Sequence, residues 1–198
     1  MVHIGSKVKF VRSNLMQESN FESRESFFAP GFKKERNKKM TIISVNYSEN
    51  RFTLEHRRLL AESLTDAVLV PEVGQFCPPA REGFQVHFTE RPTDKMAIGG
   101  KLLSDIPDHD VIVINLLVME GDWPKKVRKQ VIENILASLT KVLAVPEPSP
   151  SWWVTFQVIE EGSWGSRSSV LSILDLLDSG VFAEEKIKAI QKNIQNNS

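Results

Sequence analysis

The chain has 198 residues, 41% of them hydrophobic and 25% charged, which is enough for one sizeable core. Its 25 lysines and arginines balance 25 aspartates and glutamates, so no overall field favours a nucleic-acid or membrane partner. The longest apolar run, residues 111–119, is far too short to span a bilayer. A single cysteine, Cys77, excludes an intrachain disulfide framework and favours a reducing, cytoplasmic location.

Residues 1–40 form a basic leader. They carry nine lysines and arginines against four glutamates, a charge of +5, so the rest of the chain carries −5. The leader has no apolar segment of the kind that a secretion signal requires. Its composition favours a disordered tail over a nucleic-acid-binding arm.

Two strand–helix–strand repeats are predicted next, over residues 41–90 and 111–161. Three matches recur in the same order at offsets of about 70 to 75 residues: TIISVNY with VIVINLL, VLVPE with LAVPE, and FQV with FQV. Ordered matches at a nearly fixed offset indicate a duplication. Each repeat should contain two parallel strands joined by a right-handed helical crossover.

The first repeat opens with a strand at residues 41–47 that is rich in isoleucine and valine. A helix is expected to follow with Thr53 as its N-cap, and Pro71 is expected to lie just beyond its end. A second strand is predicted at residues 83–90. Gln85 and His87 stand two apart on it, so they share a face and are expected to line one polar patch.

The second repeat has the same order. A strand is predicted at residues 111–117, and Asp122 is expected to cap a helix whose first turn contains Pro124. Pro146 should lie beyond the end of this helix, and a strand is predicted at residues 153–161.

We therefore expect an α/β fold in which the repeats form a four-stranded mixed sheet with two helices on one face. Residues 91–110 are expected to connect the repeats, and residues 166–198 to form a C-terminal helical extension. The other face of the sheet is predicted to be bare and apolar. Because such a face is unstable in water, oligomerisation is expected.

Motifs for other chemistries are absent from the sequence. It has no phosphate-binding glycine loop and no nucleophile elbow, and its four histidines have no metal-ligand spacing with Cys77 or with one another. Neither a metal nor a cofactor is therefore expected.

The duplicated unit resembles the tautomerase superfamily, in particular its branch that is like malonate semialdehyde decarboxylase and 4-oxalocrotonate tautomerase. The matching stretches are TIISV, REGFQV, VIVINLLVMEGDWPKKVRKQVIENILASL and WVTFQVIEEGSWG, which all lie within residues 41–165. The resemblance implies a tautomerase-like domain there, a homotrimer, and a small keto/enol or semialdehyde compound as substrate. In that family the amine of an N-terminal proline, its pKa lowered by its surroundings, moves a proton beside substrate-binding arginines.

Thr41 stands where that proline would stand, directly after Met40. A chain that starts at Met40 and loses it would offer the primary amine of Thr41. A chain that keeps the leader has an amide nitrogen there, which is not a base. The sequence leaves both forms open.

The resemblance implies further site residues. Glu82 lies near the place of a catalytic aspartate and Gln85 in a shared FQV, so both are expected to assist Thr41 in catalysis. The expected substrate-binding residues are Arg81, His87 and Trp164. Each also has an ordinary explanation: a solvated loop carboxylate, a surface ion pair, a half-exposed strand residue, or an indole packed at an interface.

The family's arginine around a glycine turn is replaced here by Glu120 and Asp122, which would repel a carboxylate substrate. Two hypotheses follow. One is a tautomerase/isomerase-like or decarboxylase-like enzyme, and the other is a non-catalytic trimer that binds or scaffolds.

Overall fold

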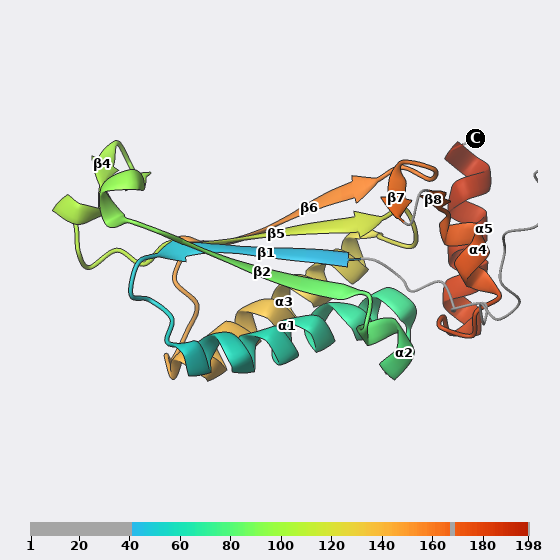
Figure 1. Cartoon of the computed structure of the whole chain (residues 1–198), viewed down its shortest axis with the longest axis horizontal. Helices are drawn as coiled ribbons and strands as arrows, with labels where there is room; N and C mark the ends of the chain where they lie inside the picture. Colours follow the sequence, from blue (N-terminus) through green and yellow to red (C-terminus); the bar gives the residue numbers. More distant parts are fainter. Residues whose placement is uncertain (1–40, 167–168, 198) are drawn as a thin grey trace, which may run out of the picture. The chain divides into compact units, whose positions relative to one another are not determined.

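The computed structural model describes residues 41–166 and 169–197, which all lie within one unit of the chain, Arg36–Ser198. A four-stranded sheet has two long helices against one face, which is the predicted α/β architecture (Figure 1). The predicted leader lies outside the described residues, and the predicted domain boundaries stay predictions.

The sheet joins the two repeats side by side in the order β2-β1-β5-β6. Within each repeat the strands are parallel, and β1 pairs with β5 antiparallel, with Ser44 directly opposite Asn115. The sheet is therefore mixed, as predicted. Its strands are β1 (Thr41–Ser48), β2 (Phe84–Arg91), β5 (Ile112–Met119) and β6 (Trp152–Ile159).

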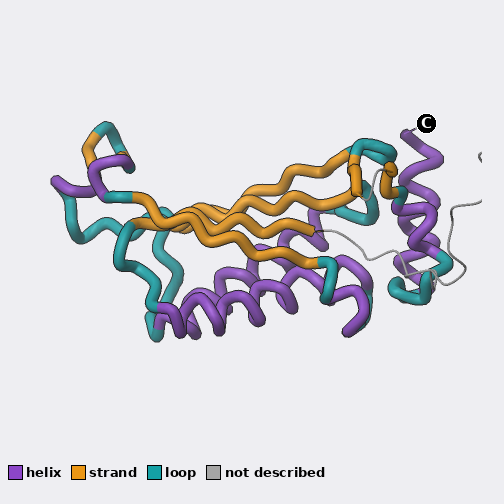
Figure 2. The backbone as a smooth tube through the Cα atoms, in the orientation of Figure 1, coloured by secondary structure: helices purple, strands orange, loops and turns teal. Residues whose placement is uncertain are grey.

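The crossover helices α1 (Leu54–Val73) and α3 (Lys125–Leu143) lie on the same side of the sheet, as Figure 2 shows. Thr53 caps α1 as predicted, because its hydroxyl accepts a 3.1 Å hydrogen bond from the backbone N–H of His56. Side chains from both helices meet alternate residues of the central strands in one core. Its fully buried members include Ile43, Val45, Leu60, Leu64, Ile114, Leu116 and Ile135.

The position of Pro71 was predicted wrongly, because α1 continues through it to Val73. A proline in a helix cannot donate to the carbonyl four residues earlier, here that of Ala67. The side-chain amide of Asn134 on α3 donates to this carbonyl instead, at 3.2 Å. The neighbouring helix thus replaces the missing bond. The helix ends at Gly74, whose φ of +81° favours glycine.

The predicted cap of the second helix was also wrong. Among the described residues no side chain caps α3, whose N-cap position is Pro124. The carboxylate of Asp122 instead accepts from Lys186 Nζ at 2.7 Å, with the two side chains only 16% and 14% exposed. The ammonium is 64 residues away in sequence, so a local pattern gave no sign of it. Pro146 does lie beyond the end of its helix, as predicted.

The face of the sheet opposite the helices is not apolar, contrary to prediction. Strand register places a polar row across its middle, formed by His87, Ser44, Asn115 and Thr155. Thr155 Oγ1 donates to Asn115 Oδ1 at 2.7 Å. Each strand alternates, so most of its apolar residues face the helices, and polar residues lie on the open side beside a few apolar ones such as the exposed Trp153. The apolar area exposed on this face therefore does not by itself require oligomerisation.

The shorter elements lie before the second strand of the first repeat, in the connector, and near the C-terminus. The connector contains a hairpin flanked by 3₁₀ turns, and a second hairpin precedes the two C-terminal helices. In chain order these elements are α2 (Pro78–Arg81), η1 (Thr93–Lys95), β3 (Ala97–Ile98), β4 (Lys101–Leu102), η2 (Leu103–Asp105), β7 (Trp164–Ser166), β8 (Ser169–Leu171), α4 (Ile173–Leu177) and α5 (Glu184–Asn197).

The C-terminal helices build a second hydrophobic core at one end of the sheet. Leu176, Val181 and Ile190 are buried there with Leu69 and Val73 of α1, and Met119 of β5 joins them. The backbone N–H of Ala183 donates to the carbonyl of Val73 at 2.9 Å, which fixes α5 against the end of α1. Within the described residues, no helix combines the length and apolar composition needed to traverse a membrane.

Candidate functional site

Thr41, which the resemblance implies would stand in the place of a catalytic proline, is fully buried at the start of β1. Its backbone N–H donates to the carbonyl of Gly83 at 3.4 Å. Its hydroxyl donates to the carboxylate of Glu72 on α1, with oxygen–oxygen distances of 3.1 and 3.2 Å. Glu72 is itself only 3% exposed. In the chain that includes the leader, this position is therefore a closed, hydrogen-bonded part of the core.

Glu82 and Gln85 flank the strand start that pairs with Thr41. Glu82 is the C-cap residue of α2 and directly precedes Gly83, the partner of the Thr41 amide, so the backbone brings Glu82 to this end of the sheet. Gln85 pairs with Ile42, and its side chain therefore lies on the opposite face from that of Thr41. Any catalytic role for Glu82 or Gln85 stays a prediction.

His87 lies on the open face together with Gln85, as their spacing predicted. Gln85 Oε1 and His87 Nε2 are 3.0 Å apart, and both side chains are exposed. The two residues thus form one polar pair at the outer strand of the sheet. The role of His87 in substrate binding stays a prediction.

Arg81 is already engaged by α1. Its Nε donates to Asp66 Oδ1 at 2.7 Å and its Nη2 to Asp66 Oδ2 at 3.3 Å. The hydrogen bond to Asp66, with the charges of Asp66 and Glu62, raises the pKa of the Arg81 guanidinium. A substrate that used Arg81 would have to displace this carboxylate or share it.

Trp164 lies in β7, half-buried, and packs against the second core formed with the C-terminal helices. The turn formed by Glu120, Gly121 and Asp122 is bonded on this side as well. Glu120 Oε2 accepts from the backbone N–H of Glu161 at 2.9 Å, and the carbonyl of Gly121 accepts from Asn193 Nδ2 at 3.3 Å. The C-terminal extension thus contacts this turn through Asn193, a contact that the sequence did not reveal.

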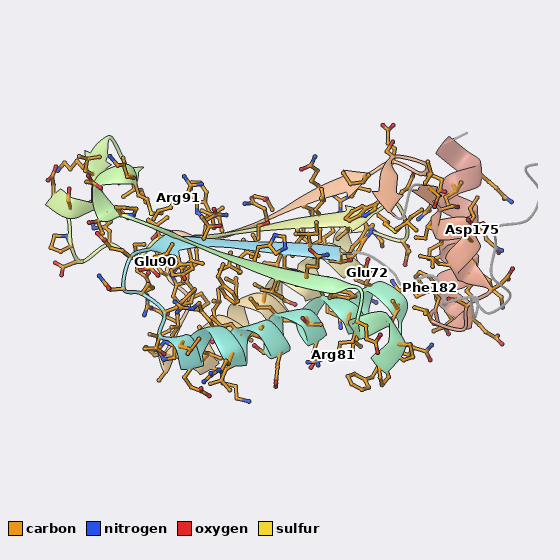
Figure 3. The ribbon with its side chains drawn as sticks, viewed as in Figure 1. Glu72, Arg81, Glu90, Arg91, Asp175 and Phe182 are labelled. Atoms are coloured by element: carbon orange, nitrogen blue, oxygen red, sulfur yellow. The ribbon has the colours of Figure 1, made fainter. Side chains whose placement is uncertain are left out.

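A pocket of about 400 Å³ lies elsewhere, at the opposite end of the sheet and on its open face. Its walls come from β1, the end of β2, the β3–β4 hairpin, and the starts of β5 and β6. Figure 3 labels Arg91 at this end and Glu72 and Phe182 at the other. Sequence reasoning missed the pocket because its residues come from five separate segments.

A metal is not suggested by the residues at either end. Over residues 41–166 and 169–197, no three or more His, Cys, Asp or Glu side chains come together as metal ligands do.

Comparison with known proteins finds likeness in structure. No protein-family model matches the sequence, and no curated protein matches it significantly. A member of the cis-3-chloroacrylic acid dehalogenase family, N1, matches with a TM-score of 0.55 at 15% identity, over 76% of this chain and 99% of that one. A fused 4-OT asymmetric trimer matches with a TM-score of 0.53 at 19% identity, over 70% of this chain and 98% of that one. Pt0534 inactivated by 2-oxo-3-pentynoate matches with a TM-score of 0.54 at 14% identity, over 67% of this chain and 98% of that one. The fold is therefore that of the tautomerase superfamily, as the resemblance implied.

Proposed function

We propose that this chain, whose fold is that of the tautomerase superfamily, is a divergent member that binds a small keto/enol or semialdehyde compound without proline-type catalysis. The observation that carries the proposal is the state of Thr41. Its nitrogen donates within the sheet to Gly83, and its hydroxyl is held by the buried Glu72. An amide nitrogen in a backbone hydrogen bond has no free lone pair with which to take a proton from carbon.

Assembly as a homotrimer is part of the proposal. Three of the similar structures are fused 4-OT trimers, two asymmetric and one symmetric. Away from the hairpin end, the open face of this sheet carries polar side chains beside half-buried apolar ones, Ile42 and Leu117, a mixture suited to a partly hydrated subunit contact. The single cysteine fits a trimer that works in the cytoplasm. Sedimentation at micromolar concentration tests the trimer, and a monomer that does not change on dilution contradicts it.

A second candidate function applies to a chain that begins at Thr41. Its free amine would lie beside Glu72, and a nearby carboxylate favours the protonated form of an amine and raises its pKa. Such a group donates a proton more readily than it removes one. The nearness of the Glu82 segment to Thr41 favours this candidate, because Glu82 would supply a base for water.

The test compares two forms of the protein, the full chain and a chain beginning at Thr41, both carrying Cys77→Ser. Each is incubated with 2-oxo-3-pentynoate, an electrophile that adds to amines and thiols, and intact mass is measured. Each is then assayed for ketonisation of phenylpyruvate enol. The serine variant removes Cys77, the one thiol that would react regardless of mechanism.

For the full chain we expect no adduct in the Thr41 region and ketonisation at the solvent rate. A full chain that accelerates ketonisation overturns the proposal. For the chain that begins at Thr41, ketonisation above the solvent rate supports the second candidate, if it is lost on blocking the terminal amine and falls in Glu82→Ala.

A further inference from the structure

We propose that the pocket at the hairpin end of the sheet binds a small apolar carboxylate, with Arg91 pairing with the carboxylate and Trp153 covering the apolar body. This site rests on the proposed binding function and gives it a location and a ligand class. It lies at the far end of β1 from Thr41, so it is independent of any chemistry at that residue.

The pocket has the size and composition of a small-molecule site. Its volume of about 400 Å³ falls within the range of roughly 300–1,000 Å³ typical of such sites. Most of its lining is apolar, contributed by Met96 and Ile98 of the hairpin region, by Val111 and Val113, and by Trp153. A mainly apolar cavity with few polar groups selects a ligand that is itself mainly apolar.

Among the residues that the structure describes, Arg91 is the one charged residue that lines the pocket. Over residues 41–166 and 169–197 it forms no ion pair, and its guanidinium approaches the amide oxygen of Asn46 at 3.5 Å. The preceding residue, Glu90, faces the helix side and lies 3.7 Å from Arg57, as the alternation of a strand requires. The two labelled side chains lie on opposite sides of the strand in Figure 3. The positive charge of Arg91 therefore remains available, and a planar guanidinium matches a carboxylate in two parallel hydrogen bonds.

Asn115 is a second polar residue in the lining. Asn115 accepts the Thr155 hydroxyl proton at its Oδ1, at 2.7 Å, which leaves its Nδ2 to donate into the pocket. The Ser151 hydroxyl already donates to the carbonyl of Asp110 at 2.8 Å. A cation and an amide N–H₂ beside one apolar wall favour an anionic head group over a neutral or cationic one.

Trp153 provides the apolar surface. Its side chain is 60% exposed, whereas its neighbour Trp152 is 5% exposed. Its indole N–H donates to the carbonyl of Pro150 at 3.2 Å, so a hydrogen bond within the protein positions the ring and its face can contact a ligand. A flat aromatic or branched aliphatic body would cover this ring and Val113, and each buried apolar Å² contributes about 25 cal/mol.

The experiment uses the full chain and the fluorescent probe 8-anilino-1-naphthalenesulfonate, which joins an anionic group to an aromatic body. Binding is measured by titration, followed by competition with 1-naphthoate and with its neutral isostere 1-naphthamide. The variants are Arg91→Gln, Arg91→Lys, Trp153→Ala and the control Arg58→Gln. Arg58 is an arginine on α1 whose side chain is 67% exposed and lies outside the pocket lining.

We expect saturable binding of one probe per chain, displaced by 1-naphthoate at a concentration about tenfold lower than 1-naphthamide requires. Arg91→Gln should remove this preference and weaken probe binding by about tenfold, and the affinity of Arg91→Lys for the probe should lie between those of the parent and Arg91→Gln. Trp153→Ala should lower the affinity for both 1-naphthoate and 1-naphthamide. Arg58→Gln should bind as the parent does. Circular dichroism of each variant shows whether the fold is intact.

Equal displacement by the acid and the amide overturns the proposal, as does equal probe binding in Arg91→Gln and Arg58→Gln. Such a failure leaves the mass and ketonisation results at Thr41 unaffected, so the two proposals fail separately.

Discussion

The hydrogen bond from Asn134 to the carbonyl of Ala67 should be worth more than an ordinary helix-to-helix contact. Pro71 removes the N–H that would otherwise satisfy this carbonyl, and Ala67 is only 7% exposed, so water has little access to replace it. Leaving a buried acceptor unsatisfied costs about 1–3 kcal/mol. We therefore expect Asn134→Ala to lower the free energy of unfolding by that amount, and Tm by about 2–4 °C for each kcal/mol.

A double-mutant cycle tests the reason as well as the size. Pro71→Ala restores an N–H that can bond to Ala67 in the helix, so Asn134→Ala should cost about 0.5 kcal/mol in that background. Urea unfolding at one fixed protomer concentration is the assay, because an oligomer would make stability depend on concentration. Ser138→Ala is the control, since its hydroxyl donates within its own helix to the carbonyl of Asn134. An equal cost of Asn134→Ala in both backgrounds refutes the reasoning.

Three further predictions concern other contacts. Thr41→Val should destabilise the chain by about 1–3 kcal/mol in urea unfolding, because the buried Glu72 loses a hydroxyl donor, and unchanged stability contradicts this. Gly74→Ala should lower the free energy of unfolding by at least about 2 kcal/mol in the same assay, because φ is +81° and the added Cβ would lie 2.9 Å from the side chains of Ala183 and Lys186. A loss below about 1 kcal/mol would show that α5 shifts freely. The backbone N–H and hydroxyl of Thr93 lower the pKa of Glu49, so this contact is present above pH ~4.3 and is lost as pH falls through the lowered value. The Thr93 amide signal in NMR should titrate with a midpoint below that pH, and a midpoint at or above it contradicts the contact.

The repeats were predictable because each strand and helix carries its own pattern. Isoleucine- and valine-rich runs placed β1 and β5, and the spacing around Thr53 placed the start of α1. The mixed sheet followed from the duplication and the crossover rule. What failed depended on distant partners. Pro71 lies inside the helix, and the carbonyl that it leaves unbonded is bonded by Asn134 of another helix. Asp122 is bound by the ammonium of Lys186, which only the folded chain brings near.

The candidate site was less accessible to sequence reasoning. The nearness of Glu82 to the start of β1 could be predicted from the order of strands, because parallel neighbours begin at the same edge. The opposite faces of Thr41 and Gln85 follow from register, which a sequence alone leaves unspecified. The pocket beside Arg91 depends on how the connector folds back as a hairpin, and its composition of Pro, Gly and Asp predicted only that it connects the repeats.

The antiparallel pairing of Ser44 with Asn115 gives the sheet a local twofold axis between its repeats. Rotation about that axis exchanges the start of β1 with the start of β5, so Ile112 is the counterpart of Thr41. The two repeats thus have equivalent ends, about 25 Å apart along an eight-residue strand. One is sealed by the C-terminal extension, and the other opens beside Arg91. A chain built in this way can lose an ancestral site at one end and acquire a different one at the other, without any change to the sheet that separates them.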